Sequence, residues 1–302
     1  MKNIIFDSNY RPSFSGHETF ALRQMWLVKA FNAIASSHKD IFSNEDAIVT
    51  FGVGKNMVSS IKHWAIASGI IEGSGGNYAP TELGEKIFGN NGLDKFCERY
   101  ATSWLVHWNL VGRTKHGPRA TTWYLAFNHI GEQIFQAKQL VTAIEDYLEK
   151  KIPNVTVSAK TLENDVKVFF STYVSKASVS VEDVAEPMLA ELGLIQIGAN
   201  GLYEFRRGPK ATLPDSVFLY ALIDYWQNSA PNQKTLSFES IAYDPGSPGR
   251  VFKLDEDSVA ERLINLEKTS QGRYIWSDTA GQKNVICIAE MSPIEALEVM
   301  ND

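Results

Sequence analysis

The chain has 302 residues, 44% of them hydrophobic and 21% charged, which indicates a globular protein with real hydrophobic cores and excludes a disordered one. It has no run of 18 or more apolar residues, no signal-peptide pattern at its start, and only two cysteines, Cys97 and Cys287, without metal spacing, so we expect a cytoplasmic protein that lacks disulfides and zinc fingers. The net charge of −6 means that any contact with DNA must use local basic patches or a partner protein.

Residues 1–88 predict a winged helix-turn-helix domain, because three helices, with a tight turn before the third, are followed by a β-hairpin. Apolar residues at helical spacing predict the first helix, and Ser15 with Glu18 just before it fits a capping box. The expected elements are helices over 20–35, 47–51 and 55–67, a turn over 52–54, strands over 70–72 and 77–80, and a helix that begins at 81.

The segment FGVGKNMVSSIKHW, residues 51–64, contains a Gly-x-Gly-Lys that could belong to a nucleotide-binding loop or to a DNA-binding turn. A P-loop needs a glycine five residues before Gly54 and a serine or threonine after Lys55. The chain has Val49 and Asn56 at these positions. The donors and the metal-binding hydroxyl of a P-loop are therefore missing, and the segment is interpreted as the turn and recognition helix of the winged helix.

On this recognition helix we expect a buried stripe of Met57, Ile61, Trp64 and Ala65. The polar side chains would then lie outside, where asparagine suits adenine and lysine suits phosphate or guanine. The residues expected to bind DNA are Lys55, Asn56, Ser59, Lys62 and His63, with Ser60 beside them. The alternative is a solvated polar face that mediates only protein contacts.

Residues 89–155 predict a helical, aromatic-rich region with helices over 96–110, 121–130 and 131–150. The loop between the first two helices is the densest basic segment of the chain, and Trp108 and Trp123 flank it. Basic loops beside aromatic side chains suit distorted or single-stranded nucleic acid. We expect DNA binding here by Arg113, Lys115, His116 and Arg119. The alternative is an exposed loop over aromatic core helices.

Residues 156–302 predict a C-terminal helical domain with β-hairpins, whose first half has the order of a second winged helix. Arg206 and Arg207, with Lys210, would lie at the tip of the second wing and grip DNA; ordinary surface charge is the alternative. The expected elements are helices from 158 and over 180–193, 217–226, 238–242 and 258–267, hairpins of 194–197 with 202–207 and of 273–276 with 284–288, and a rigid exposed turn over 245–249. The whole chain is therefore expected to be mainly α with small β-hairpins, an α+β fold.

The adjacent residues His17 and Glu18 are the candidates for catalysis. A histidine and a carboxylate could serve as general base and metal ligand in phosphodiester hydrolysis. No H-E-x-x-H pattern follows, and the metal ligands of such a site cannot be named from the sequence. The alternative is structural, with Glu18 in a helix cap and His17 buried and hydrogen-bonded.

Three segments resemble a bacterial family of unknown function: FSGHETF at 14–20, GVGKNMV at 52–58 with Ile61 and Trp64, and SPGRVFKL at 247–254. The resemblance covers nearly the whole chain. Members of the family lie beside phosphoadenosine-phosphosulfate-reductase-like genes in DNA phosphorothioation clusters, and the chain is similar to the SspB-like subunits of the Ssp antiphage defence system. The resemblance implies that DNA is nicked to permit sulfur insertion, with Mg or Mn as a divalent cofactor, and that DNA and the subunits of a sulfur-transfer complex are the partners.

The residues themselves leave two other functions open. A winged helix serves equally well in a transcription regulator that carries no chemistry. It also serves as an adaptor surface in a protein-interaction scaffold. The family resemblance supplies no catalytic motif at defined positions of this chain.

Overall fold

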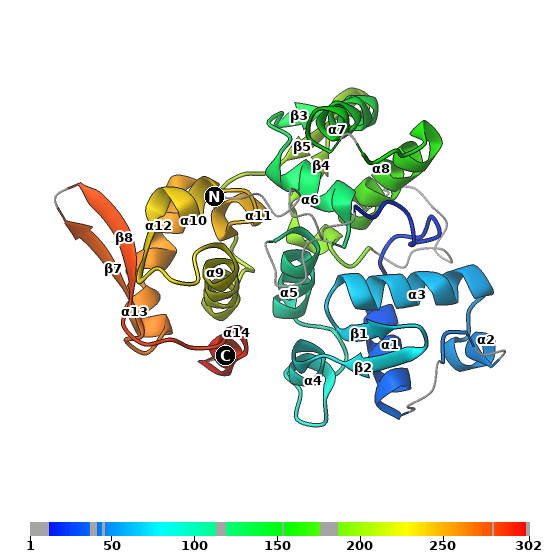
Figure 1. The fold of residues 1–302 in the computed structure, drawn as a ribbon, viewed down its shortest axis with the longest axis horizontal. Helices are drawn as coiled ribbons and strands as arrows, with labels where there is room; N and C mark the ends of the chain where they lie inside the picture. Colours follow the sequence, from blue (N-terminus) through cyan, green and yellow to red (C-terminus); the bar gives the residue numbers. More distant parts are fainter. Residues whose placement is uncertain are drawn as a thin grey trace.

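The computed structural model describes residues 12–36, 41–43, 46–112, 119–152, 154–175, 187–279 and 281–299. Within these ranges the chain forms helices and three small antiparallel sheets, so the expected α+β class is confirmed. Three groups of elements surround a central pair of helices (Figure 1). None of the described helices has the length and apolar character needed to cross a membrane.

The first group of elements follows the predicted order. It consists of α1 (Gln24–Ser36), α2 (Ala47–Phe51), α3 (Lys55–Ala67), the hairpin of β1 (Ile71–Ser74) and β2 (Asn77–Pro80), and α4 (Glu82–Phe88). Gly52 ends α2 with a φ of 64°, a left-handed conformation that glycine adopts without steric cost. Thr81 caps α4 by accepting a hydrogen bond from the Gly84 N–H. The helix-turn-helix order is present, while its use as a DNA-binding winged helix stays a prediction.

The buried surface of α3 is wider than the predicted stripe. Ser60 is fully buried and Met57 is only half-buried, contrary to the expectation for both residues. The reason is that α3 packs against α1 on one side, while Trp64 reaches Trp123 on the other, with ring centroids 5.4 Å apart. The residues that α3 buries are Val58, Ser60, Ile61, Trp64, Ala65 and Ala67.

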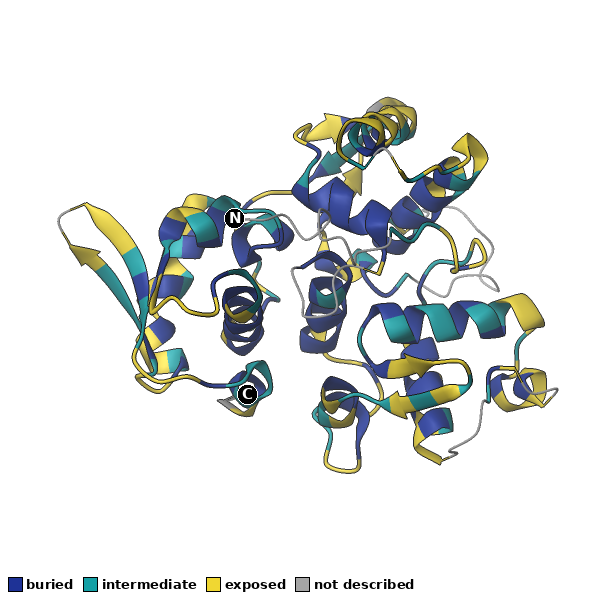
Figure 2. Ribbon diagram, in the orientation of Figure 1, coloured by how far each residue is buried: buried dark blue, intermediate teal, exposed yellow. Residues whose placement is uncertain are grey.

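The central pair of helices consists of α5 (Tyr100–Val111) and α6 (Thr121–Asn128), which are buried on almost every side (Figure 2). Buried polar groups connect this pair to later parts of the chain. His107 of α5 lies 2.7 Å from the Tyr173 hydroxyl and 3.0 Å from the Val251 carbonyl oxygen. Because the carbonyl can only accept, Nε2 of His107 donates to it and Nδ1 accepts from the tyrosine. Burial lowers the pKa of His107 to about 3 and keeps it neutral.

The second group contains α7 (Ala137–Lys151), α8 (Ala159–Tyr173) and a three-stranded sheet in the order β3–β5–β4. The strands are β3 (Ile134–Phe135), β4 (Ile195–Ile197) and β5 (Tyr203–Phe205). The expected hairpin is present. The helix predicted over 131–150 begins only at Ala137, and residues 134–135 form β3 instead, which is too short to show alternation. The helix predicted over 180–193 lies outside the described residues up to 186, and after them only Ala190–Leu192 form a turn of 3-10 helix.

The third group is organised around α9 (Asp215–Ser229), whose residues from 216 to 226 are all buried. It also contains α10 (Phe238–Tyr243), α11 (Pro248–Val251), α12 (Glu256–Ile264), α13 (Leu266–Thr269), α14 (Pro293–Ala296) and a sheet of β6 (Thr235–Ser237), β8 (Gln282–Cys287) and β7 (Tyr274–Thr279) in that order. Two further 3-10 turns are Ala199–Gly201 and Leu297–Val299.

The expectation of a rigid exposed turn over 245–249 is wrong. Residues 246–249 are buried, and Pro248 begins α11 with Ser247 as its cap. The Gly246 N–H donates to Asn128 Oδ1 at 2.7 Å, which fixes the segment to the end of α6. A Cβ built on Gly249 would lie 2.7 Å from the Cα of Ala242, so only glycine permits this contact between α11 and α10.

Candidate functional site

The loop that carries the predicted catalytic pair has an unusual backbone. Ser15, Gly16, Glu18 and Thr19 all have positive φ, at 81°, 91°, 48° and 66°. Left-handed backbone in three residues other than glycine is costly and persists only where the surrounding structure determines it. The predicted capping box of Ser15 and Glu18 is therefore wrong, since α1 begins only at Gln24.

His17 is the residue that fixes this loop. Its Nε2 lies 2.6 Å from Oδ1 of Asp165 on α8, and its Nδ1 accepts a hydrogen bond of 3.1 Å from the Thr19 N–H. Nδ1 therefore carries no proton, and Nε2 donates to the carboxylate. The same Asp165 oxygen accepts the Ser15 N–H at 2.8 Å. One carboxylate thus holds both the backbone and the imidazole of the loop.

Aromatic rings surround the His17 imidazole. It stacks on Trp64 of α3 at a centroid distance of 6.1 Å and lies 6.1 Å from Trp123 of α6. His17 is 2% exposed, whereas Glu18 points into solvent. The two residues are adjacent in sequence but do not form one site. With both ring nitrogens occupied inside the protein, His17 joins the loop, α3, α6 and α8 to one another.

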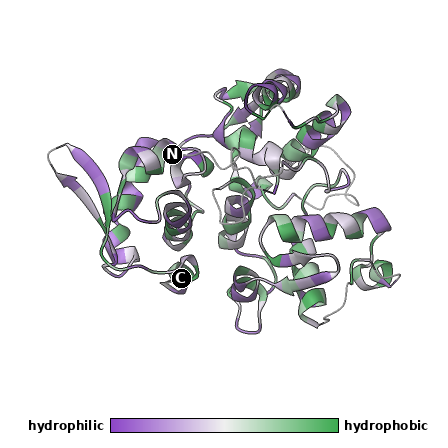
Figure 3. Cartoon of the chain, in the orientation of Figure 1, coloured by the Kyte–Doolittle hydropathy of each residue, from purple (hydrophilic) through white to green (hydrophobic). Residues whose placement is uncertain are grey.

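The polar face of α3 is divided into two halves. Lys55 and Asn56 at its start are exposed, and Ser59 and Lys62 are half-exposed. This first turn lies at the outer edge of the molecule beside α2, and it is exposed in Figure 2 and hydrophilic in Figure 3. Among the described residues no side chain caps the helix at Gly54, so within this part of the chain its first N–H groups are open to an anion.

His63, in the second half of α3, is turned toward the His17 loop. Its ring lies 5.9 Å from that of His17, and a Cβ on Gly16 would approach its Nδ1 to 2.6 Å. Burial, and then the neighbouring His17, lower the pKa of His63 to about 4. A neutral imidazole covered by a loop is a weak phosphate ligand. His63 is therefore not part of the exposed surface that Lys55 belongs to.

The remaining predicted DNA-binding residues lie elsewhere. Arg119 is exposed just before α6, while Arg113, Lys115 and His116 lie outside the described residues. Arg206 and Arg207 follow the end of β5 and do not occupy the tip of the β4–β5 hairpin, which is the turn around 198–202. The predicted position of these two arginines was wrong by the length of one strand.

The donors that a divalent metal would need do not gather among the residues that the structure describes. No group of three or more histidine, cysteine, aspartate or glutamate side chains is found there. Oδ2 of Asp165 is buried and has no hydrogen-bond partner, but it is a single oxygen. Magnesium takes carboxylate oxygens together with several waters, and one enclosed oxygen does not meet that requirement. The described residues therefore do not show where the predicted Mg or Mn would bind.

Three residues that were not predicted from the sequence have prominent positions in the structure. Asp165 could not be found, because it lies 148 residues from His17 and no short motif connects them. Arg250 and Lys253 belong to the segment 247–254, which was noted only for its family resemblance. The positive charges of Arg250 and Lys253, close to Gly246 and Gly249, were the sequence signal that could have marked these residues as a candidate anion site.

Comparisons with known proteins agree with the resemblance noted in the sequence. Residues 14–301 match the model of a family described as a protein of unknown function, DUF4007. A comparison with curated proteins finds no match. A magnesium ion-bound SspB crystal structure is similar, with a TM-score of 0.86 and 28% identity over 96% of this chain and 87% of that chain. A second SspB crystal structure has a TM-score of 0.85 and 29% identity over the same shares.

Proposed function

The chain belongs to the DUF4007 family and is SspB-like, and from this premise we propose that it is the DNA-binding subunit of a bacterial DNA phosphorothioation and defence system. In this role it nicks DNA so that sulfur can be inserted, together with partner subunits that carry out the sulfur transfer. The observation that carries the proposal is the structural similarity to SspB over 96% of the chain.

The exposed first half of α3 supports DNA as the ligand. Lys55 and Lys62 lie on the same face of α3, seven residues or about two turns apart, and Asn56 lies beside Lys55 in the first turn. Two cations and the free N–H groups of a helix start form a surface that suits phosphate. The winged helix-turn-helix arrangement would place this end of α3 against the duplex.

The acidic net charge limits the strength of DNA binding by the chain alone. Long-range attraction to DNA needs an excess of positive charge, and this chain carries −6. We therefore propose that the partner subunits share the contact with DNA, and that α3 positions the nicking subunit on it.

A plasmid assay tests the proposal. Supercoiled plasmid is incubated with the pure chain in a series of MgCl₂, MnCl₂ and EDTA, and relaxed circles are quantified while filter binding measures retained DNA. We expect DNA retention in all buffers and relaxation only with a metal. Retention without relaxation under any metal, with footprinting at one promoter, would instead establish a transcription regulator. Absence of both DNA retention and relaxation would favour the third function, a protein-interaction scaffold.

A further inference from the structure

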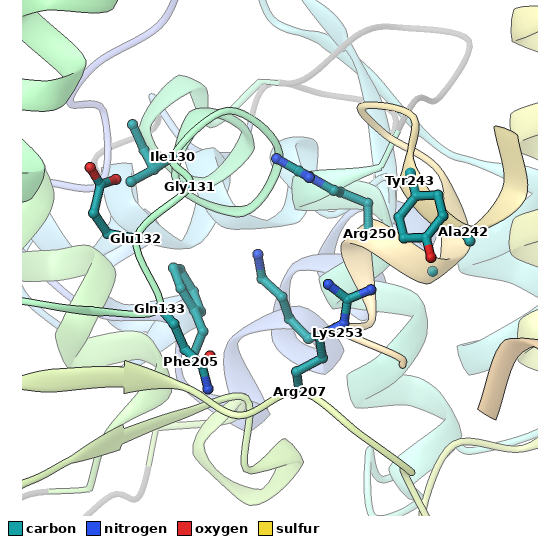
Figure 4. Close-up of a pocket in the computed structure, with 11 residues that line it drawn as sticks. Ile130, Gly131, Glu132, Gln133, Phe205, Arg207, Ala242, Tyr243, Arg250 and Lys253 are labelled. Carbon is teal, nitrogen blue, oxygen red and sulfur yellow. The ribbon is translucent and has the colours of Figure 1, made fainter. Parts of the chain in front are cut away.

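A small pocket lies where the second and third groups of elements meet. Its walls are the loop that follows α6, the end of β5, and the segment from α10 to just after α11 (Figure 4). The cavity has a volume of about 140 Å³. Three cationic side chains reach into it: Arg207 from the end of β5, and Arg250 and Lys253 from α11 and the residues just after it.

Neutral backbone oxygens hold all three cations in place. Arg250 donates from Nε and Nη2 to the Asn128 carbonyl at 3.1 and 2.7 Å. Lys253 donates from Nζ to the Phe127 carbonyl at 2.8 Å, and Arg207 donates from Nε to the Leu254 carbonyl at 3.1 Å. Carbonyls orient the side chains but leave their charges uncompensated, and each cation keeps further N–H donors.

No carboxylate balances these charges within the described part of the chain, where none of the three cations forms an ion pair. Glu132 lies on the exposed rim, and Glu256 accepts the hydroxyl of Tyr243. Asp255, just after Lys253, accepts the Ser258 N–H as the cap of α12 and forms no ion pair with the three cations. Burial, followed by Arg250 and Arg207, lowers the pKa of Lys253 to about 7. An anion that enters the pocket would stabilise the charged form of Lys253 and so raise its pKa again.

The backbone also holds Lys253 in an unusual conformation. Its φ is 52°, in the left-handed region, which is uncommon for a residue other than glycine. The Gly208 N–H fixes the Lys253 carbonyl at 3.0 Å, and the side chain lies over the Phe205 ring at 4.2 Å. A strained residue held from two sides is typical of ligand sites, where the position of a charge is set before the ligand arrives.

We propose that Arg207, Arg250 and Lys253 form a binding site for a phosphate dianion, either free or at the end of a nucleic-acid strand. Two guanidinium groups and one ammonium match the charge and the tetrahedral acceptors of this ligand. The cavity of about 140 Å³ exceeds what one water needs, so it has room for a phosphate of five heavy atoms, and it opens to solvent. The site is independent of the DNA surface on α3.

Calorimetric titration of the full chain tests this proposal with inorganic phosphate and with sulfate, at constant ionic strength. We expect one site per chain, and binding at least tenfold weaker in Lys253→Met and in Arg207→Met. Lys268→Met is the matched control, because it removes an exposed lysine of α13 and should bind as the wild type does. Arg250 is left unchanged, because it also anchors Asn128, and each variant is first compared with the wild type by thermal unfolding.

The pH dependence identifies the group responsible. Sulfate stays a dianion between pH 6 and 8, so a change in its affinity over this range reports on the protein, whose charged groups around Lys253 include Arg207, Arg250, Glu132 and Asp255. His129, beside Arg250, has its pKa lowered to about 4 and stays neutral, and Lys210, at the Lys253 carbonyl, has its pKa lowered to about 8. Sulfate affinity should fall as the pH rises above 7, and this fall should be absent in Lys253→Met.

A third titration distinguishes the source of the phosphate. Short DNA duplexes with a 5′-phosphate or a 5′-hydroxyl compete with sulfate, and tighter competition by the phosphorylated duplex would assign the site to strand ends. Equal competition, with inorganic phosphate still bound, would assign it to the free anion. Absence of binding by both anions, or equal binding in wild type, Lys253→Met and Lys268→Met, would overturn the proposal.

Discussion

The role of His17 shows how the fold separates two adjacent residues. The left-handed backbone at Glu18 turns that side chain into solvent, while the His17 imidazole lies between Trp64 and Trp123 and donates a hydrogen bond to Asp165. Of the two interpretations that the sequence left open for His17, this geometry favours the structural one. Its catalytic role stays a prediction, and the same variants test both.

We expect His17→Ala to lower the free energy of unfolding by about 1.5–3 kcal/mol, because it leaves the buried Asp165 carboxylate without its main hydrogen-bond donor. Asp165→Asn should cost less, since the amide oxygen can still accept from His17 and from the Ser15 N–H. Glu18→Gln is the exposed control and should unfold like the wild type. Urea unfolding measures all three.

Nicking by the same variants decides the catalytic question. If His17 is structural, His17→Ala should lose activity only in proportion to the fraction unfolded. A folded His17→Ala protein without nicking activity would instead support a catalytic role for His17. A stable but inactive Glu18→Gln protein would support one for Glu18.

At the scale of single elements, the sequence predicted most helices well. The bounds of α2 and α3 and the start of β2 agree with the expectation, because caps, glycine turns and helical spacing all lie close together in sequence. Elements that depend on distant partners were missed. β3 forms only through its pairing with β5, and residues 246–249 are buried because Asn128, more than a hundred residues earlier, binds them.

The buried contact of α11 with α10 gives an element-scale prediction. Gly249→Ala should lower the free energy of unfolding by about 1–3 kcal/mol, because the new methyl group would meet the Cα and the carbonyl oxygen of Ala242, each at 2.7 Å. Gly131→Ala is the matched control, since a Cβ there meets nothing within 4 Å. Its effect should stay within about 0.5 kcal/mol. Chemical denaturation compares the two, and equal stability would show that α11 can shift away from α10.

At the scale of the whole molecule, the sequence indicated the fold class, the helix-turn-helix order and the family. The predicted DNA-binding residues are dispersed: Lys55 lies at the outer edge, His63 faces the His17 loop, and Arg207 lines a separate pocket. Sequence spacing shows which residues share one helix face, whereas the packing of α3 against α1 and against the His17 loop decides which part of that face remains accessible.

The central claim is that the first half of α3 binds DNA, and the salt dependence of binding tests it most directly. Affinity for a 20-base-pair duplex is measured by fluorescence anisotropy from 50 to 200 mM NaCl, for the wild type and for Lys55→Ala combined with Lys62→Ala. Two lost phosphate contacts should flatten the slope of log affinity against log salt by about 0.9 each, about 1.8 in total. The exposed pair Lys95→Ala with Lys268→Ala keeps the same net charge as the test variant and should retain the wild-type slope. An unchanged slope and affinity in the folded α3 variant would contradict the account.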